Sequence, residues 1–252
     1  MGREAYAMTE KIKVLIGCPT CDRYRYCVDL WVERVKEIIE FSKNKGIDAD
    51  YVLVDNSKED TFFNELKKKN VEVIRYGYSE NVKSRISESR NVLREKALDK
   101  CYDYFLSLEQ DVIPPANIAE KLISHNRKIV SAYYGKPLCV VLQDKETGEI
   151  KKALLELPVV YLPVEGGIRQ ANPPEVVGKG LIKVGAFGVG CVLIHCEVLK
   201  KIKFRHEEGK EAFDDFVFCA DAKQQGYDLY LDSDIRVEHL HKVWEESYAN
   251  KL

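Results

Sequence analysis

The stretch that decides the fold is Tyr104-Phe-Leu-Ser-Leu-Glu-Gln-Asp111, an apolar run that ends in two carboxylates separated by one residue. The apolar part is typical of a buried strand. In an extended segment, residues two apart point to the same side, so we expect Glu109 and Asp111 to converge and Gln110 to face away. Two converging carboxylates repel each other unless a cation joins them, and their oxygens suit Mg²⁺ or Mn²⁺. We therefore expect a metal site here, with an ordinary polar strand end as the alternative.

The segments around this stretch alternate between strand-like and helical patterns. Strands are expected at 13–16, 51–54, 71–75, 102–108 and 129–134, and helices at 31–39, 62–69 and 86–98. Such alternation predicts an α/β fold with a mostly parallel central sheet and helices on both faces. Ligands of such sheets bind beyond the carboxyl ends of the strands, where the acidic triplet lies.

The second half of the chain has a different pattern. Two strand-like segments, 138–142 and 150–155, flank a turn at 144–148 and predict a hairpin. The segment 157–180 is rich in proline and glycine, and we expect a functional loop or partial disorder there. A buried strand at 190–194, a helix at 213–224 and two short strands at 228–231 and 235–238 complete the expected core.

Composition limits the class of protein. The 252 residues are 45% hydrophobic and 32% charged, which is typical of a globular chain. The formal net charge of −2 argues against a nucleic-acid binder. No apolar run approaches the roughly 20 residues of a membrane span, and Met1–Lys13 has no secretory apolar region. We expect a cytoplasmic protein, with peripheral docking on a membrane left open.

A second acidic pair, Asp214-Asp215, lies at the expected start of the helix at 213–224. A helix N-terminus favours carboxylates, and this alone is one explanation of the pair. The functional alternative is that one of the two is a general base for an incoming hydroxyl. Partial burial beside Phe213 and Phe216 would raise its proton affinity toward that task.

Two further polar clusters are candidates for ligand binding. His239 and His241 alternate onto one face of an extended segment, so either imidazole is a candidate to complete the coordination begun by the acidic triplet. Arg85, Arg90 and Asn91 give a basic start to the helix at 86–98, and arginine binds phosphate oxygens well. A solvated helix face is the plain alternative for this second cluster.

Eight cysteines include a Cys-x-x-Cys pair, Cys18 and Cys21. Such a pair suggests zinc or thiol chemistry, but a structural zinc site needs a second ligand pair. The nearest candidates, Cys191, His195 and Cys196, are more than 150 residues away. Buried, reduced thiols are the favoured interpretation.

Taken in order, these segments resemble the GT-A fold of nucleotide-diphospho-sugar transferases, and specifically the family-two-type glycosyltransferases. The resemblance covers residues 13–241. The matching segments are Cys18-Pro-Thr-Cys-Asp-Arg23, Val54-Asp-Asn-Ser57, Ser89-Arg-Asn91, Glu109-Gln-Asp111, Asp214-Asp-Phe216, Gly226-Tyr227 and Val237-Glu-His239.

The resemblance implies a division of labour. Residues 12–135 would form the nucleotide-sugar-binding half, 136–241 the acceptor-binding and catalytic half, and 242–252 a C-terminal tail. Asp111 would be the principal metal ligand, with Glu109 and one of the two histidines beside it, and Asp215 or Asp214 would be the base. Donor binding would fall to Pro19, Thr20, Arg23, Asp55, Arg90, Asn91 and Gln110.

The function implied is transfer of a sugar from a nucleoside-diphosphate donor to an acceptor hydroxyl, with Mn²⁺ or Mg²⁺ as cofactor and with inversion. Glu109 departs from the usual aspartate, and Asp214 from the usual glutamate. One alternative is a sugar-phosphate nucleotidyltransferase, which would need a glycine-rich, basic loop after the first strand. The other is a non-catalytic zinc-binding module built on Cys18 and Cys21.

Overall fold

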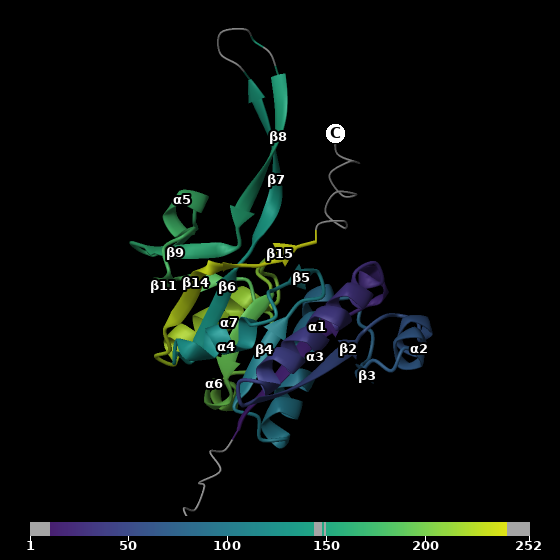
Figure 1. Cartoon of the computed structure of the whole chain (residues 1–252). Coiled ribbons are helices and arrows are strands. Elements are labelled where there is room, and N and C mark those ends of the chain that lie inside the picture. Colours follow the sequence, from purple (N-terminus) through teal and green to yellow (C-terminus); the bar gives the residue numbers. More distant parts are fainter. Residues whose placement is uncertain (1–10, 144–147, 149, 241–252) are drawn as a thin grey trace, which may run out of the picture.

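The computed structural model describes residues 11–143, 148 and 150–240 of the chain. At its centre lies an eight-stranded sheet with the order β11-β14-β6-β13-β4-β1-β2-β3 (Figure 1). Its strands are β1 (Ile12–Thr20), β2 (Ile47–Asp55), β3 (Val73–Arg75), β4 (Tyr104–Leu108), β6 (Ile129–Tyr133), β11 (Leu181–Val184), β13 (Cys191–His195) and β14 (Leu229–Arg236).

The strands of this sheet are mostly parallel, as predicted. β3, β2, β1 and β4 run parallel to one another, and so do β14 and β6. β13 lies antiparallel between β4 and β6, and β11 pairs antiparallel with β14 at the edge. Strands buried on both faces need continuous apolar sequence, which is why the Tyr104–Leu108 run forms a central strand.

Helices cover both faces of the sheet, which confirms the α/β prediction. Alternate residues of β1 enter two separate cores, with Ile16 in one and Leu15 in the other. The helices α1 (Val28–Lys43), α2 (Thr61–Lys68) and α4 (Ile118–Ser124) pack in the first core. The second core is closed by α3 (Val82–Asp99), α6 (Cys196–Lys201) and α7 (Asp214–Gln224).

The predicted hairpin is confirmed and extends from the body of the molecule as a two-stranded ribbon (Figure 1). It consists of β7 (Gly135–Gln143) and β8 (Ile150–Pro158). Most of the turn expected at 144–148 lies outside the described residues. The boundary between the two expected halves, at 135/136, falls at the start of β7, while the central sheet takes strands from both halves.

The expectation of an irregular or disordered segment at 157–180 is wrong. It contains β9 (Val160–Val164), β10 (Gly167–Gln170) and the short helix α5 (Pro173–Val176). β9 and β10 form a three-stranded sheet with β12 (Ala186–Phe187). The glycines and prolines that suggested disorder instead serve turns and a helix start: Gly166 has a φ of +76°, and Asn172 with Glu175 forms a capping box.

The two short strands expected near the C-terminus are also arranged differently. β14 is one strand with an irregularity after Asp232, and the next strand, β15 (Glu238–His239), leaves the central sheet. β15 pairs antiparallel with β5 (Val112–Ile113), which follows the acidic triplet. Tertiary pairing therefore decides where His239 lies.

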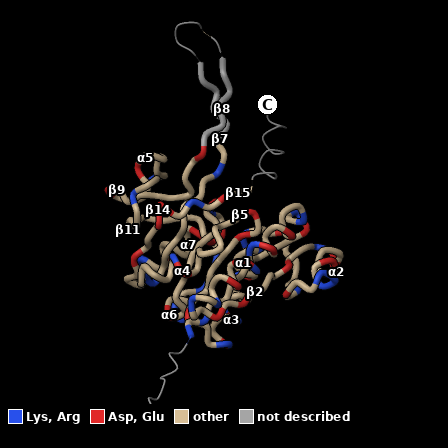
Figure 2. The backbone as a smooth tube through the Cα atoms, viewed as in Figure 1, with Lys and Arg blue, Asp and Glu red and all other residues tan. Residues whose placement is uncertain are grey.

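Charged residues of both signs are spread over the molecule. Figure 2 shows lysines and arginines interspersed with aspartates and glutamates along the body. Among the described helices, not one combines the length and apolarity that a membrane crossing requires.

Candidate active site

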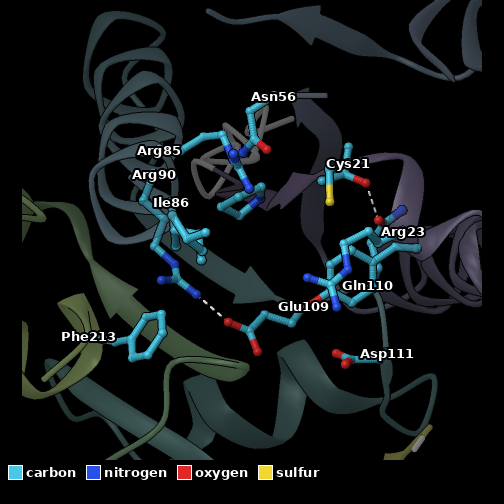
Figure 3. A pocket seen from close by; sticks show the side chains of 14 residues that line it. Cys21, Arg23, Asn56, Arg85, Ile86, Arg90, Glu109, Gln110, Asp111 and Phe213 are labelled. Atoms are coloured by element: carbon cyan, nitrogen blue, oxygen red, sulfur yellow. Dashed lines mark hydrogen bonds and ion pairs between the residues drawn. The ribbon is translucent and has the colours of Figure 1, made fainter. Parts of the chain in front are cut away.

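A cavity of about 370 Å³ lies at the carboxyl ends of β1, β2 and β4 (Figure 3). Parallel pairing brings these ends together, since Thr20 of β1 is in register with Asp55 of β2. This is the edge at which open α/β sheets bind ligands. The lining residues are Pro19, Thr20, Cys21, Arg23, Tyr24, Asn56, Val82, Arg85, Ile86, Arg90, Glu109, Gln110, Asp111 and Phe213.

The end of β1 supplies one wall. Pro19, Thr20 and Arg23 line the cavity, and the 3₁₀ turn η1 (Asp22–Tyr24) turns the chain along its rim. Thr20 is buried, and its hydroxyl donates a hydrogen bond to the Gln110 side-chain oxygen. Three donor-binding residues expected from the sequence are therefore part of one surface.

The acidic triplet is a turn rather than an extended segment, so its expected geometry is wrong. The Val112 N–H donates to the Glu109 carbonyl at 3.0 Å, which turns the chain within the triplet. Gln110 consequently forms part of the cavity wall instead of facing away. Its side chain is buried, and its Nε2 has no hydrogen-bond partner within the described part of the chain. A buried amide donor of this kind favours a ligand acceptor nearby.

Glu109 turns toward Arg90 instead of converging with Asp111 (Figure 3). The Arg90 Nη2 donates to Glu109 Oε1. Gly190 makes room for this carboxylate, because a Cβ there would lie 3.1 Å from Glu109 Oε2 and 2.7 Å from the Tyr134 hydroxyl oxygen. Burial raises the pKa of Glu109, Arg90 opposes the rise, and the Asp111 carboxylate adds to it.

Arg90 lies at the centre of a buried charge network. Its side chain is 3% exposed, and Nη1 lies 2.7 Å and 2.6 Å from the two carboxylate oxygens of Asp214. Burial would lower the pKa of Arg90, but Asp214 and Glu109 outweigh it and the pKa is raised. Arg90 lines the cavity, as expected for a donor-binding residue, yet its guanidinium is already bound to two carboxylates. The cavity holds another arginine, Arg85, whose Nε has no hydrogen-bond partner in the described structure.

The two aspartates at the start of α7 have different surroundings. Asp214 is buried and bound to Arg90, whereas Asp215 is partly buried and its Oδ1 accepts a hydrogen bond from the Phe216 N–H at 2.7 Å. Burial raises the pKa of Asp215 to about 6, with a further contribution from the Asp214 carboxylate. A carboxylate with this pKa is suited to accept a proton near neutral pH. Neither aspartate is among the residues that line the cavity.

Asp111 and His239 form the pair that fits a divalent cation. His239 Nε2 lies 3.4 Å from Asp111 Oδ2, and the Leu240 N–H donates to the Asp111 carbonyl at 2.6 Å. His239 Nδ1 lies 2.8 Å from the carbonyl oxygen of Gly135. A carbonyl only accepts, so Nδ1 carries a proton and Nε2 faces Asp111, as in metal-binding histidines. Burial would lower the pKa of His239, but its contact with Asp111 outweighs this and the pKa is raised.

The other predicted metal ligands are His241 and Glu109. His241 lies outside the described residues. Glu109 is paired with Arg90, so the described residues offer one carboxylate and one imidazole rather than the expected set of three or more. Over the described ranges, no group of three or more histidine, cysteine or acidic side chains is arranged as a ready metal cage. Mn²⁺ accepts a mixed oxygen and nitrogen pair of this kind.

Two expected donor-binding residues, Asp55 and Asn91, are not among the residues that line the cavity. Asp55 is fully buried, its Oδ1 binds the N–H and hydroxyl of Ser57, and Arg75 Nη1 is 3.6 Å from its Oδ2. It shapes the turn that presents Asn56, which does line the cavity. The Asn91 side-chain nitrogen donates to the Phe204 carbonyl at 2.7 Å, and its side-chain oxygen accepts from the Phe204 N–H at 3.0 Å. Asn91 therefore joins α3 to the segment that follows α6.

Several cavity residues were missed from the sequence. Two of them, Val82 and Ile86, lie at i and i+4 along α3, and the expected Arg90 follows at i+8, so the three share one helix face that meets the cavity. The spacing was available in the sequence, but helix periodicity alone does not say which face meets a ligand. Tyr24, Asn56 and Phe213, by contrast, are placed by turns and a helix start.

The cysteines do not form the predicted zinc alternative within the described residues. Cys18 is buried and its thiol donates to the Pro19 carbonyl at 3.0 Å, while Cys21 lines the cavity. Burial raises the pKa of both thiols. The free thiols are those of Cys18, Cys21, Cys27, Cys101, Cys191, Cys196 and Cys219.

Comparison with known proteins identifies the fold. No family model matches the chain, and no curated protein matches its sequence. Solved structures do match. They include S. aureus TarS (14% identity, 90% of this chain, 36% of that chain, TM-score 0.55) and TarS 1–349 in complex with UDP (13%, 90%, 59%, 0.53). A third is GalNAc-T7 with UDP, GalNAc and Mn²⁺ (14%, 91%, 43%, 0.54).

The fold is therefore that of the GT-A nucleotide-diphospho-sugar transferases, as the sequence resemblance predicts. The chain spans between 36% and 59% of the length of these three structures. At this level of identity the likeness concerns the fold alone.

Proposed function

We propose that this protein is a metal-dependent glycosyltransferase that moves a sugar from a nucleoside-diphosphate donor to an acceptor hydroxyl with inversion. The observation that carries the proposal is the pairing of His239 with Asp111, which lines the cavity at the carboxyl ends of β1, β2 and β4. The bound UDP and Mn²⁺ of GalNAc-T7, which has the same fold, support it.

The donor would lie along the cavity wall. Thr20 and Gln110 offer a hydroxyl and a buried amide donor, and Arg85 offers a guanidinium for phosphate oxygens. Asp111 and His239 would hold Mn²⁺ or Mg²⁺. When bound, this cation neutralises the charge that develops on the departing nucleoside diphosphate.

Asp215 would be the catalytic base. Arg90 binds Asp214 and so fixes the first turn of α7, while Asp215, the next residue, has no such buried ion pair among the described contacts. With a pKa of about 6, it is ionised at pH 7 and able to remove the proton of the attacking hydroxyl. Attack on the anomeric carbon from the side opposite the diphosphate inverts that centre.

The test is a binding and turnover screen of the full chain. Thermal unfolding is first measured with UDP, GDP, CDP and dTDP, each with and without Mn²⁺, because a ligand that binds only the folded state raises the midpoint. Release of the same nucleoside diphosphate from its sugar donor is then measured for the wild type, Asp111→Ala and Asp215→Ala. We expect Mn²⁺-dependent stabilisation and loss of turnover in both variants.

Two outcomes would overturn the proposal. Full turnover by both variants would show that Asp111 is not the metal ligand and Asp215 is not the base. Pyrophosphate release from a nucleoside triphosphate and a sugar 1-phosphate, without turnover of any nucleoside-diphosphate sugar, would instead establish a nucleotidyltransferase.

A further inference from the structure

Phe213 is an aromatic side chain that the proposed chemistry leaves without a role. It lines the cavity, yet it is 43% exposed, which is unusual for a phenylalanine. It is the residue before the first turn of α7, and its extended backbone (φ −84°, ψ 175°) places it outside the helix. Figure 3 shows its ring at the edge of the cavity, beside the Arg90–Glu109 pair. Phe213 is two residues before Asp215, the proposed base, in the sequence.

Lys83 of α3 holds the segment that carries this ring. The Lys83 Nζ lies over one face of the Phe213 ring, 5.5 Å from its centre, so the other face is the one that a ligand could contact. The same Nζ donates to the Lys210 carbonyl at 2.6 Å. It also lies 3.8 Å from Glu211 Oε2. These three contacts join α3 to residues 210–213, so the ring is fixed in place while much of its surface stays open.

Two apolar residues of α3 line the cavity together with Phe213. Val82 is 41% exposed, and Ile86 lies one helical turn further along. We call Val82, Ile86 and Phe213 the apolar lip. In the sequence of α3, the charged residues Lys83 and Arg85 lie between Val82 and Ile86. The lip is therefore a small patch and not a long apolar groove.

We propose that the apolar lip binds the sugar ring of a carbohydrate acceptor, with Phe213 as the platform for that ring. This inference rests on the proposed function, because it places the acceptor hydroxyl near Asp215. One face of a pyranose ring is lined with C–H groups and packs on an aromatic face, while its hydroxyls need polar partners. The lip with its charged neighbours offers both. A lipid chain would need a longer uninterrupted apolar surface.

The first measurement is saturation-transfer NMR on the full chain with UDP and Mn²⁺ present. The probes are methyl β-glucoside, methyl β-galactoside, methyl N-acetyl-β-glucosaminide and methyl α-mannoside. The variants are Phe213→Leu, which removes the flat ring, and Phe213→Tyr, which keeps it. We expect the C–H protons of one ring face of at least one glycoside to be saturated in the wild type and in Phe213→Tyr, and this signal to be lost in Phe213→Leu.

The second measurement is steady-state transfer to the glycoside that binds. In Phe213→Leu we expect the acceptor KM to rise about three- to tenfold, the effect of losing one aromatic contact. The Kd of the nucleoside diphosphate, measured by titration calorimetry, should stay within twofold of the wild type, which shows that the variant is folded.

The outcomes separate the two proposals. Normal nucleotide binding with an unchanged acceptor KM in Phe213→Leu overturns the platform. Turnover of the donor with no glycoside bound or glycosylated overturns the carbohydrate class of acceptor. If the wild type binds no nucleoside diphosphate, the proposed function itself fails, and the acceptor inference fails with it.

Discussion

Arg90 Nη1 lies within 2.7 Å of both carboxylate oxygens of Asp214, although the two residues are 124 positions apart in the chain. The contact joins α3 to the first turn of α7, and Nη2 of the same guanidinium binds Glu109 at the end of β4. One buried arginine therefore connects the strand that carries the acidic triplet with the helix that carries the proposed base. It gives the two adjacent aspartates different surroundings, which the sequence left equivalent.

The first prediction concerns the stability of this network. Arg90→Met leaves the buried Asp214 carboxylate without its partner, and we expect it to lower the free energy of unfolding by about 3–5 kcal/mol. Urea denaturation checks this value. The double variant Arg90→Met/Asp214→Leu removes the Arg90–Asp214 pair and should recover the part of the loss that comes from Asp214, while Glu109 still lacks its partner. A single variant within about 1 kcal/mol of the wild type would contradict a buried ion pair, since that is the range of exposed pairs.

The second prediction concerns the pH dependence of transfer. The base must be ionised, and the pKa of Asp215 in the free protein is about 6, so kcat/KM should rise with pH through about 6 and level off above pH 7. Asp215→Asn should lower kcat by about 10²–10⁴-fold and remove this limb of the profile. In Asp214→Asn the limb should remain but move to lower pH, because the neighbouring charge that raises the pKa is gone. An unchanged profile in Asp215→Asn would exclude this residue as the base.

The third prediction concerns the cost of keeping Asp215 ionised. Its pKa is raised from 3.8 to about 6 in the folded protein, so the folded state binds this proton more tightly than the unfolded state. Stability is consequently lost as the pH rises from about 4 to about 6. At pH 7.5, Asp215→Asn should be more stable than the wild type by about 3 kcal/mol, and at pH 3.5 the difference should vanish. Urea denaturation at the two pH values measures it, and equal stability at pH 7.5 would contradict the raised pKa.

The fourth prediction concerns the divalent cation. Asp111→Asn and His239→Gln should each weaken Mn²⁺-dependent binding of nucleoside diphosphate by about 10–100-fold, and binding without Mn²⁺ should change little. Glu109→Gln should have a smaller effect, because Arg90 already binds that carboxylate. Titration calorimetry and the electron paramagnetic resonance of Mn²⁺ report this without any turnover. Equal effects of Glu109→Gln and Asp111→Asn would show that Glu109 is also a ligand of the cation.

The fifth prediction concerns Arg85. Arg85 lines the cavity; its Nη1 donates to the Ser79 carbonyl at 2.6 Å, and its Nε has no hydrogen-bond partner in the described structure. We expect Arg85→Met to weaken nucleoside-diphosphate binding about tenfold, the effect of one charged hydrogen bond of about 1.5 kcal/mol. The affinity of the variant should also depend less on salt. Lys96→Met is the matched control, because Lys96 lies on the same helix and pairs with Glu72 away from the cavity. If the two variants bind equally well, Arg85 does not contact the donor.

Much of the architecture follows from local sequence patterns. The apolar run before Glu109 and the alternation of strands with helices determine the α/β class, since a strand buried on both faces needs continuous apolar sequence. The error at 157–180 has a physical reason. Proline and glycine signal irregular backbone, but here they serve the turn at Gly166 and the start of α5, while the strands between them are short and only partly buried.

The site is only partly encoded in local patterns. Pro19 and Thr20 end a buried strand and Arg23 follows it, and this position alone predicts that they lie at the ligand edge of the sheet. Asn91 follows Arg90 by one residue and so points to a different side of α3, where it binds Phe204. Side-chain direction at a helix surface depends on which face packs on the sheet, and that is decided by contacts between distant segments.

In the acidic triplet, the sequence determines where the carboxylates lie along the chain, and the tertiary structure determines their contacts. The sequence alone determined that carboxylates follow a buried strand at the ligand edge of a mostly parallel sheet, because apolar pattern and strand order are local properties. Only the tertiary structure decided what each member of the triplet contacts: Glu109 binds Arg90, Gln110 binds Thr20 and Asp111 faces His239. The physical reason is that a turn and the β5–β15 pairing set these directions, and both depend on residues far away in the chain.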